Sequence, residues 1–161
     1  MQIRKAALED LDRILEIYAY ARKFMRENGN PDQWKDSYPP KDTLLTDISS
    51  EKLHLCVDGE KILAVFYYAK EDEPTYHEID GQWINNKPYA VAHRVASAEG
   101  SKGAATFCLN WAFEQSGDLR IDTHTDNKPM QGLLKKLGFV YCGKIKLEDG
   151  SPRIAFEKVR A

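Results

Sequence analysis

The passage from Tyr89 to Ser116 constrains the fold more than any other part of the sequence. It starts with an apolar strand pattern over Tyr89–Ser97, continues through small residues that include Gly100 and Gly103, and ends in a long helix pattern. A strand with apolar or small residues on both faces is typical of the centre of a sheet that helices cover on both sides. The passage therefore predicts an α/β fold.

The turn between this strand and this helix is a candidate anion site. A helix that begins there presents unpaired backbone N–H groups and the positive end of its dipole. The small residues around Gly103 leave these groups open to a ligand, and phosphate is the natural occupant. The alternative is an ordinary glycine turn that binds nothing, because short glycine motifs are weak signals by themselves.

Length, charge and cysteine usage exclude several classes of protein. The 161 residues predict one domain over 1–161, and 42% hydrophobic with 30% charged residues is typical of a soluble globular chain. A net charge of -2 argues against a nucleic-acid partner. The three cysteines are scattered in apolar runs, which predicts reduced, buried thiols and no metal site. No signal or membrane-spanning pattern occurs, so we expect a cytoplasmic protein without a membrane partner.

The remaining patterns predict a mixed sheet with helices on both faces. Segment 70–88 is open: it either extends the preceding hairpin, with Tyr76, Ile79 and Trp83 contacting the body, or leaves the body as a mobile excursion. Helices are expected over 7–28, 41–50, from the turn 98–105 onward through Phe107 to Ser116, and over 130–137. Strands are expected over 1–5, 53–57, 61–69, 89–97, 119–123, 139–147 and 153–159, with the segments from 53 to 69 and from 139 to 159 forming hairpins.

The loop over residues 29–40 carries two aromatic residues, Trp34 and Tyr38. Exposed aromatic side chains often mark contact surfaces, so both are candidates for binding a substrate. The alternative is that they pack on the core as a lid.

Ionisable residues interrupt two of the predicted core strands. His93 and Arg94 lie in the strand 89–97, and Asp122 and His124 lie at the end of the strand 119–123. Buried charges are costly unless they are paired, and such clusters are enriched at functional sites. Strand alternation places His93 and Arg94 on opposite faces, so one of them can face the side of Asp122 and His124. The structural alternative is a buried ion pair between Arg94 and Asp122.

The order of elements and two motifs resemble the Gcn5-related N-acetyltransferase superfamily. Gly100, Gly103 and Ala105 occupy three positions of its phosphate-binding turn, and Asn127 followed by Leu137-Gly138-Phe139 matches its later block. The resemblance implies a mostly antiparallel sheet with a splayed parallel central strand pair. It also implies transfer of an acetyl group from acetyl-CoA to an amine of a small molecule or peptide, and the capacity to form a homodimer.

The resemblance also assigns a set of residues to coenzyme A. The pantetheine arm would pair with the strand around Val95, and the pyrophosphate would lie on backbone amides of the turn. The full set of cofactor-binding candidates is Val95, Ala96, Ser97, Gly100, Ser101, Lys102, Gly103, Ala104, Ala105, Thr106 and Asn127. Two positions depart from the family: Gly100 replaces the usual Gln or Arg, and Leu134 replaces a Tyr that often protonates the departing thiolate.

Acetyl transfer to an amine needs a proton acceptor, oxyanion donors and a proton for the thiolate. His124 is the leading candidate for the general base, with His93 or Arg94 lining the acceptor site and Asp122 orienting an imidazole. Tyr141 is the candidate acid. Two other functions stay open: a non-catalytic domain that binds or senses acyl-CoA, and an unrelated α/β scaffold.

Overall fold

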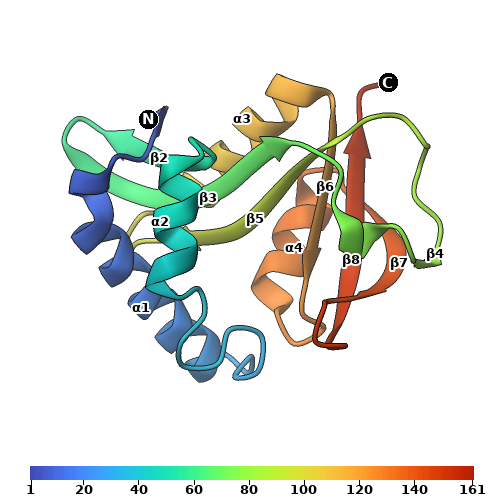
Figure 1. The fold of residues 1–161 in the computed structure, drawn as a ribbon, viewed down its shortest axis with the longest axis horizontal. Helices are drawn as coiled ribbons and strands as arrows, with labels where there is room; N and C mark the ends of the chain where they lie inside the picture. Colours follow the sequence, from blue (N-terminus) through green and yellow to red (C-terminus); the bar gives the residue numbers. More distant parts are fainter.

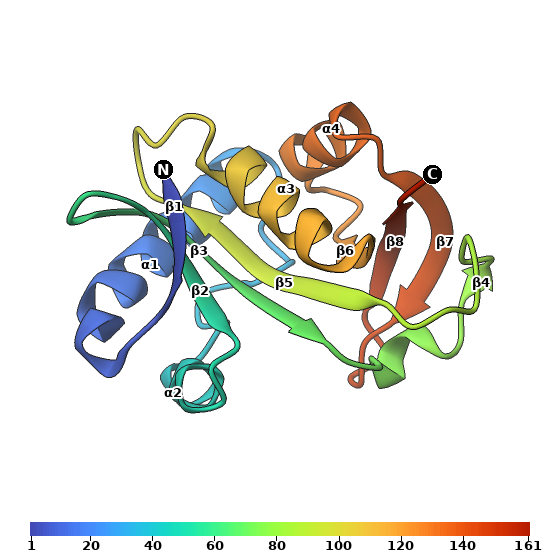
Figure 2. The same ribbon diagram turned by 90° about the horizontal axis from the view of Figure 1, so that it is seen from above.

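The computed structural model describes residues 1–161 and contains one eight-stranded sheet, in the order β1-β2-β3-β5-β6-β8-β7-β4 (Figures 1 and 2). In chain order the elements are β1 (Gln2–Lys5), η1 (Leu8–Asp10), α1 (Leu11–Glu27), α2 (Lys41–Ser49), β2 (Leu53–Asp58), β3 (Lys61–Lys70), η2 (Pro74–Tyr76), β4 (Asp80–Gly81), β5 (Ala90–Ser97), α3 (Ala104–Ser116), β6 (Asp118–Thr123), α4 (Lys128–Lys136), β7 (Val140–Lys146) and β8 (Pro152–Val159). These elements confirm the predicted α/β class.

The centre of the sheet is its one parallel strand pair, β5 and β6. They are joined only at their first residues, where Ala90 pairs with Leu119 and Val91 with Arg120. All other neighbours are antiparallel, including the two predicted hairpins, β2–β3 and β7–β8. Past Val91 the two central strands diverge, and Figure 2 shows the sheet opening into two halves. The predicted splayed pair is therefore confirmed.

Helices cover both faces of the sheet, as the apolar strand pattern predicted. The alternation of side chains along β2 shows how this arises. Leu55 and Val57 pack into the core shared with α1 and α2, whereas Cys56 between them packs into the core with α3 and α4. In Figure 1, α2 lies in front of the sheet and α3 behind it. None of these helices combines the length and apolar character needed to cross a bilayer.

The segment between β3 and β5 packs on the body but does not extend the β2–β3 hairpin. It runs to the far edge of the sheet, where β4 pairs with β7. Tyr76 is fully buried and accepts a hydrogen bond from Trp83 Nε1 at its carbonyl oxygen, at 3.0 Å. Ile79 and Trp83 pack against the same small core. The segment thus joins the two diverging halves of the sheet.

A buried ion pair fixes this segment at the closed end of the splay. Arg120 on β6 donates to Glu157 on β8 at 3.0 Å, and its guanidinium lies between the rings of Trp83 and Tyr89 at 4.2 and 4.0 Å. Asp118 lies nearby, almost buried, with no hydrogen-bond partner for its Oδ1. Burial, followed by the neighbouring Glu157, raises the pKa of Asp118 to about 7.

We expect this raised pKa to make folding stability depend on pH. Between its ordinary value near ~3.9 and about 7, the folded chain holds a proton that the unfolded chain has released, so stability falls as pH rises through this window. Asp118→Asn should remove that slope and raise the unfolding free energy at pH 8 by about 1–2 kcal/mol. Urea unfolding from pH 4 to 8 measures both curves. Parallel curves for wild type and variant would contradict the expectation.

Candidate functional site

Two adjoining cavities open where β5 and β6 diverge. The first, the polar cavity, has a volume of about 560 Å³ and lies between the loop 29–40, β5, β6 and the β7–β8 turn. The second, the turn cavity, has about 470 Å³ and lies between α1, the end of β5, the turn before α3 and α4. The residues that line both are Met25, Val95, Asn127 and Met130. A ligand in the turn cavity can therefore reach into the polar cavity.

The turn that borders the turn cavity contains backbone amides without acceptors. The first backbone bond of α3 runs from the Phe107 amide to the Gly103 carbonyl, and no backbone carbonyl accepts from the amides of Lys102, Gly103, Ala105 or Thr106. Gly103 has φ = 85°, and a Cβ built there would meet no atom within 4 Å. Unpaired amides at a helix start with open space in front of them form an anion site.

The structure brings together most residues predicted to bind coenzyme A. Asn127 lies at the junction with the polar cavity, and its side chain caps α4 by accepting from the Met130 amide at 3.1 Å. Ala104 faces the core instead. Gly103 and Thr106 do not line the cavity with side chains, so any part they take is through their amides. The predicted residues that line the turn cavity are Val95, Ala96, Ser97, Gly100, Ser101, Lys102, Ala105 and Asn127.

A bulge in β5 shapes the polar cavity. Arg94 has φ = 52°, and the pairing of β3 with β5 shifts register at this point. The buried hydroxyl of Tyr18 donates to the Arg94 carbonyl oxygen at 2.7 Å and holds the bulge. His93 and Arg94 both line the polar cavity as a result. The expectation that they face opposite sides was wrong, because a bulge interrupts strand alternation.

The structural alternative, an ion pair between Arg94 and Asp122, does not form. Arg94 donates to Asp47 of α2 at 2.8 and 3.0 Å, and to the Tyr38 hydroxyl at 3.1 Å. Burial raises the pKa of Asp47, and the Arg94 charge opposes that effect. The bulge turns Arg94 toward α2, so Asp47 of α2 neutralises its charge and no residue of β6 does so.

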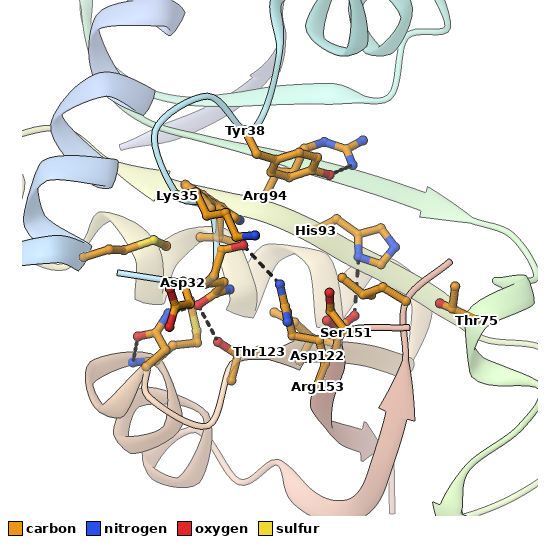
Figure 3. A pocket seen from close by; sticks show the side chains of 18 of the residues that line it. Asp32, Lys35, Tyr38, Thr75, His93, Arg94, Asp122, Thr123, Ser151 and Arg153 are labelled. Carbon is orange, nitrogen blue, oxygen red and sulfur yellow. Dashed lines mark hydrogen bonds and ion pairs between the residues drawn. The ribbon is translucent and has the colours of Figure 1, made fainter. Parts of the chain in front are cut away.

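The imidazole of His93 lies between the carboxylates of Glu73 and Asp122, and Figure 3 shows it above Asp122. Its Nε2 is 3.2 Å from Glu73 Oε1 and its Nδ1 is 4.0 Å from Asp122 Oδ2. The Glu73 contact lacks hydrogen-bond alignment, so the buried Nε2 has no hydrogen-bond partner in the protein. The interaction with His93 lowers the pKa of Glu73, although burial opposes it. The Tyr76 hydroxyl fixes Asp122 by donating a hydrogen bond to its Oδ2 at 2.6 Å.

The other predicted site residues occupy different surroundings. His124 lines neither cavity, because its Nδ1 accepts from the Asp126 amide at 3.0 Å within the turn before α4. Tyr141 on β7 is 54% exposed, packs against Phe156 and also lies outside both cavities. Trp34 and Tyr38 line the polar cavity, and Trp34 is also buried against Tyr18. Both proposed roles of Trp34, lid and lining residue, are compatible with this position.

The lining residues of the polar cavity that the sequence did not single out include Gln33, Glu73 and Arg153. Gln33 joins the loop to α4 by accepting from Asn127 Nδ2 at 2.9 Å. Glu73 belongs to the acidic run KEDE, which has the pattern of a solvent-exposed segment. Arg153 interrupts the start of the last apolar strand, the same signal that singled out His93 and Arg94. That signal could have been applied to Arg153 as well.

A splayed parallel strand pair, a helix start with free amides beside it and two adjoining cavities define the acyl-CoA acyltransferase class of fold. Solved structures of acetyltransferases have the same fold. A GNAT-family acetyltransferase from Streptococcus agalactiae matches with TM-score 0.88 and 27% identity, over 99% of this chain and 95% of that one. An acetyltransferase structure from Staphylococcus aureus matches with TM-score 0.73 and 26% identity, over 99% of both chains. No protein-family model and no curated protein matches the sequence.

The chain belongs to the Gcn5-related N-acetyltransferase superfamily, whose general reaction is acyl transfer. A more distant relative, an acetyltransferase structure from Salmonella typhimurium, was solved with its cofactor acetyl-CoA. It is 13% identical and has TM-score 0.65, over 99% of this chain and 94% of that one. At this identity the likeness shows the fold alone.

Proposed function

We propose that residues 1–161 form a single N-acetyltransferase domain that moves an acetyl group from acetyl-CoA to an amine of a small molecule or peptide. The observation that carries the proposal is the junction of the two cavities at the splayed strands. An anion-binding turn cavity continues there into a polar cavity that contains a histidine between two carboxylates. A donor and an acceptor can therefore meet from opposite sides.

The donor would occupy the turn cavity. The amides of Lys102, Gly103, Ala105 and Thr106 would hold the pyrophosphate, with the Lys102 ammonium adding positive charge. The pantetheine arm would follow β5 from Ser97 towards Val95, where the side facing β6 has no strand partner. The thioester would then lie near Val95, the residue of β5 that lines both cavities.

The acceptor would enter the polar cavity, where His93 takes a proton from its ammonium or from the attacking amine. The positive charge that the imidazole gains is met by Glu73 and Asp122. The amine then attacks the thioester carbon, free backbone N–H groups of the splayed strand stabilise the oxyanion, and the carbon–sulfur bond breaks. The departing thiolate can take its proton from the imidazolium or from water. Because His124 lines neither cavity, the geometry favours His93 as the base.

One observation favours a second function, a non-catalytic domain that binds or senses acyl-CoA. Leu134 is fully buried in the core and can donate no proton, whereas the family often has at this position a tyrosine that protonates the thiolate. Such a domain would keep the turn cavity and lack turnover.

Measurement of free coenzyme A thiol distinguishes the two functions. We expect the purified protein to release thiol from acetyl-CoA only when an amine acceptor is present, and mass spectrometry to find one added acetyl group on that acceptor. Acceptor-dependent release should rise with pH as more of the amine loses its proton. Tight coenzyme A binding by calorimetry without release across a broad amine panel would support the sensor. No binding of coenzyme A at all would overturn both.

A further inference from the structure

The polar cavity contains one buried guanidinium that lacks an acidic partner. Arg153, at the start of β8, is 7% exposed and lines this cavity. Its hydrogen bonds go to two backbone carbonyls, that of Pro152 at 2.8 Å and that of Gln33 at 3.0 Å. No carboxylate lies within 4.0 Å of it. The other arginines with comparably buried side chains, Arg94 and Arg120, each have a carboxylate at 2.8 to 3.0 Å.

A guanidinium has five N–H donors, and the two carbonyls leave several donors of Arg153 without an acceptor. Burying a charge is costly unless a counter-charge and hydrogen bonds compensate it. The planar fork of donors matches the two oxygens of a carboxylate. Arg153 is therefore a preformed site for a carboxylate that the chain itself does not supply.

The position of Arg153 relative to Asp122 limits what can carry that carboxylate. Asp122 pairs with Ala155 across β6 and β8, so Arg153, two residues before Ala155, projects from the same face of the sheet. Diagonal neighbours of this kind have Cα atoms about 7–8 Å apart. Figure 3 shows Arg153 and Asp122 side by side beneath His93. The wall of the cavity formed by β6 and β8 thus carries the positive charge of Arg153 beneath His93, the proposed base.

The cavity also has charged residues at its rim, and their exposure to solvent decides how strongly they interact with a ligand. Asp32, Glu148, Asp149 and Lys35 line the rim and are all exposed, so water and salt screen them. They favour no single acceptor, although the acids alone would attract a polyamine. Arg153, Glu73 and Asp122 are at most partly exposed and interact more strongly with a bound ligand.

We propose that the acceptor is an amino acid, whose carboxylate pairs with Arg153 while its amine faces His93, Glu73 and Asp122. This inference rests on the proposed acetyltransferase function and names the substrate class of the same site. The reaction is N-acetylation: the amine nitrogen forms a bond to the acetyl carbon, the carbon–sulfur bond of acetyl-CoA breaks, and the proton leaves through His93.

Matched pairs of acceptors test the carboxylate. The common L-amino acids are compared with their carboxamides, with the amines that lack the carboxyl group, and with spermidine. We expect at least one amino acid to exceed its carboxamide by about 10- to 100-fold in kcat/KM, the effect of a lost charge-assisted hydrogen-bond pair. Equal or better use of carboxamides or spermidine would overturn the inference and leave the acetyltransferase function standing.

Variants of Arg153 test the assignment to this residue. Arg153→Gln should lose about 10- to 100-fold in kcat/KM for the amino acid, chiefly through KM, and nothing for its carboxamide. Arg153→Lys should fall between, because it keeps the charge and loses the fork. Arg160→Gln, which changes an exposed arginine at the other end of β8, should leave both acceptors unchanged. Equal loss for amino acid and carboxamide would show a structural role and overturn the assignment.

A binding measurement separates this inference from the proposed function. With coenzyme A present, the amino acid should raise the melting temperature of the wild-type protein, and this rise should vanish in Arg153→Gln. If coenzyme A binds and no amine is acetylated, the catalytic proposal fails. The change in melting temperature on adding the amino acid still tests whether Arg153 binds a carboxylate. If no amino acid shifts the wild-type melting temperature or is acetylated, the inference is wrong.

Discussion

Gly103→Glu should abolish binding of coenzyme A, with a loss of affinity of at least about 100-fold. The glutamate would place a negative charge beside the amides of Lys102, Ala105 and Thr106, where the pyrophosphate is proposed to lie. Several kcal/mol of phosphate binding would be lost, and each 1.4 kcal/mol corresponds to about tenfold in affinity. The space in front of Gly103 is open, so the new side chain would occupy the site without displacing protein atoms. Calorimetric titration with coenzyme A measures the effect.

Two controls separate charge and bulk from backbone strain. Gly103 has φ = 85°, a conformation that asparagine tolerates better than other side chains, so Gly103→Asn should bind coenzyme A more tightly than Gly103→Glu. Gly59, in the β2–β3 hairpin, also has positive φ and open space around it, and Gly59→Glu should bind like wild type. If Gly103→Glu binds coenzyme A normally, the pyrophosphate lies elsewhere.

His93→Gln should lower kcat/KM by about 10²- to 10⁴-fold, the usual range for loss of a general base. Its affinity for coenzyme A should change little, since His93 lines only the polar cavity. Wild-type turnover in this variant would show that His93 is not the base, and would assign proton removal to a chain of water molecules.

Two other histidines are matched comparisons for this variant. His77 is an exposed histidine that contacts Asp72 at 2.6 Å outside both cavities, and His77→Gln should be silent. His124→Gln tests the base that the sequence favoured. A larger loss in His124→Gln than in His93→Gln would show that the turn before α4 moves into the cavity when substrates bind, and would reverse the assignment.

The sequence was a good guide to local structure because its signals are local. The small-residue turn with Gly100 and Gly103, the hairpin at Asp58-Gly59 and the apolar strand before Ser97 depend on neighbouring residues and strand or helix periods. The cofactor site is proposed from the same kind of signal, since its proposed ligands are neighbouring amides of one turn. The path of segment 70–88 could not be predicted, because the pairing of β4 with β7 joins residues about sixty positions apart.

The proposed acceptor site is different, because it consists of side chains brought together from distant segments. Glu73, His93, Asp122 and Arg153 come from a loop and three strands, and no spacing in the sequence relates them. Strand alternation gave the wrong orientation at Arg94, because the bulge held by Tyr18 changes which face a side chain occupies.

The sequence by itself thus determined the α/β elements and the glycine turn before α3, since backbone conformation there is set by residues close in the chain. Only the tertiary structure decided which charges meet. Arg94 is neutralised by Asp47 of α2, His93 lies between Glu73 and Asp122, and Arg153 has no acidic partner. The physical reason is that a buried charge is governed by neighbours in space, and the bulge and the divergence of β5 from β6 choose those neighbours.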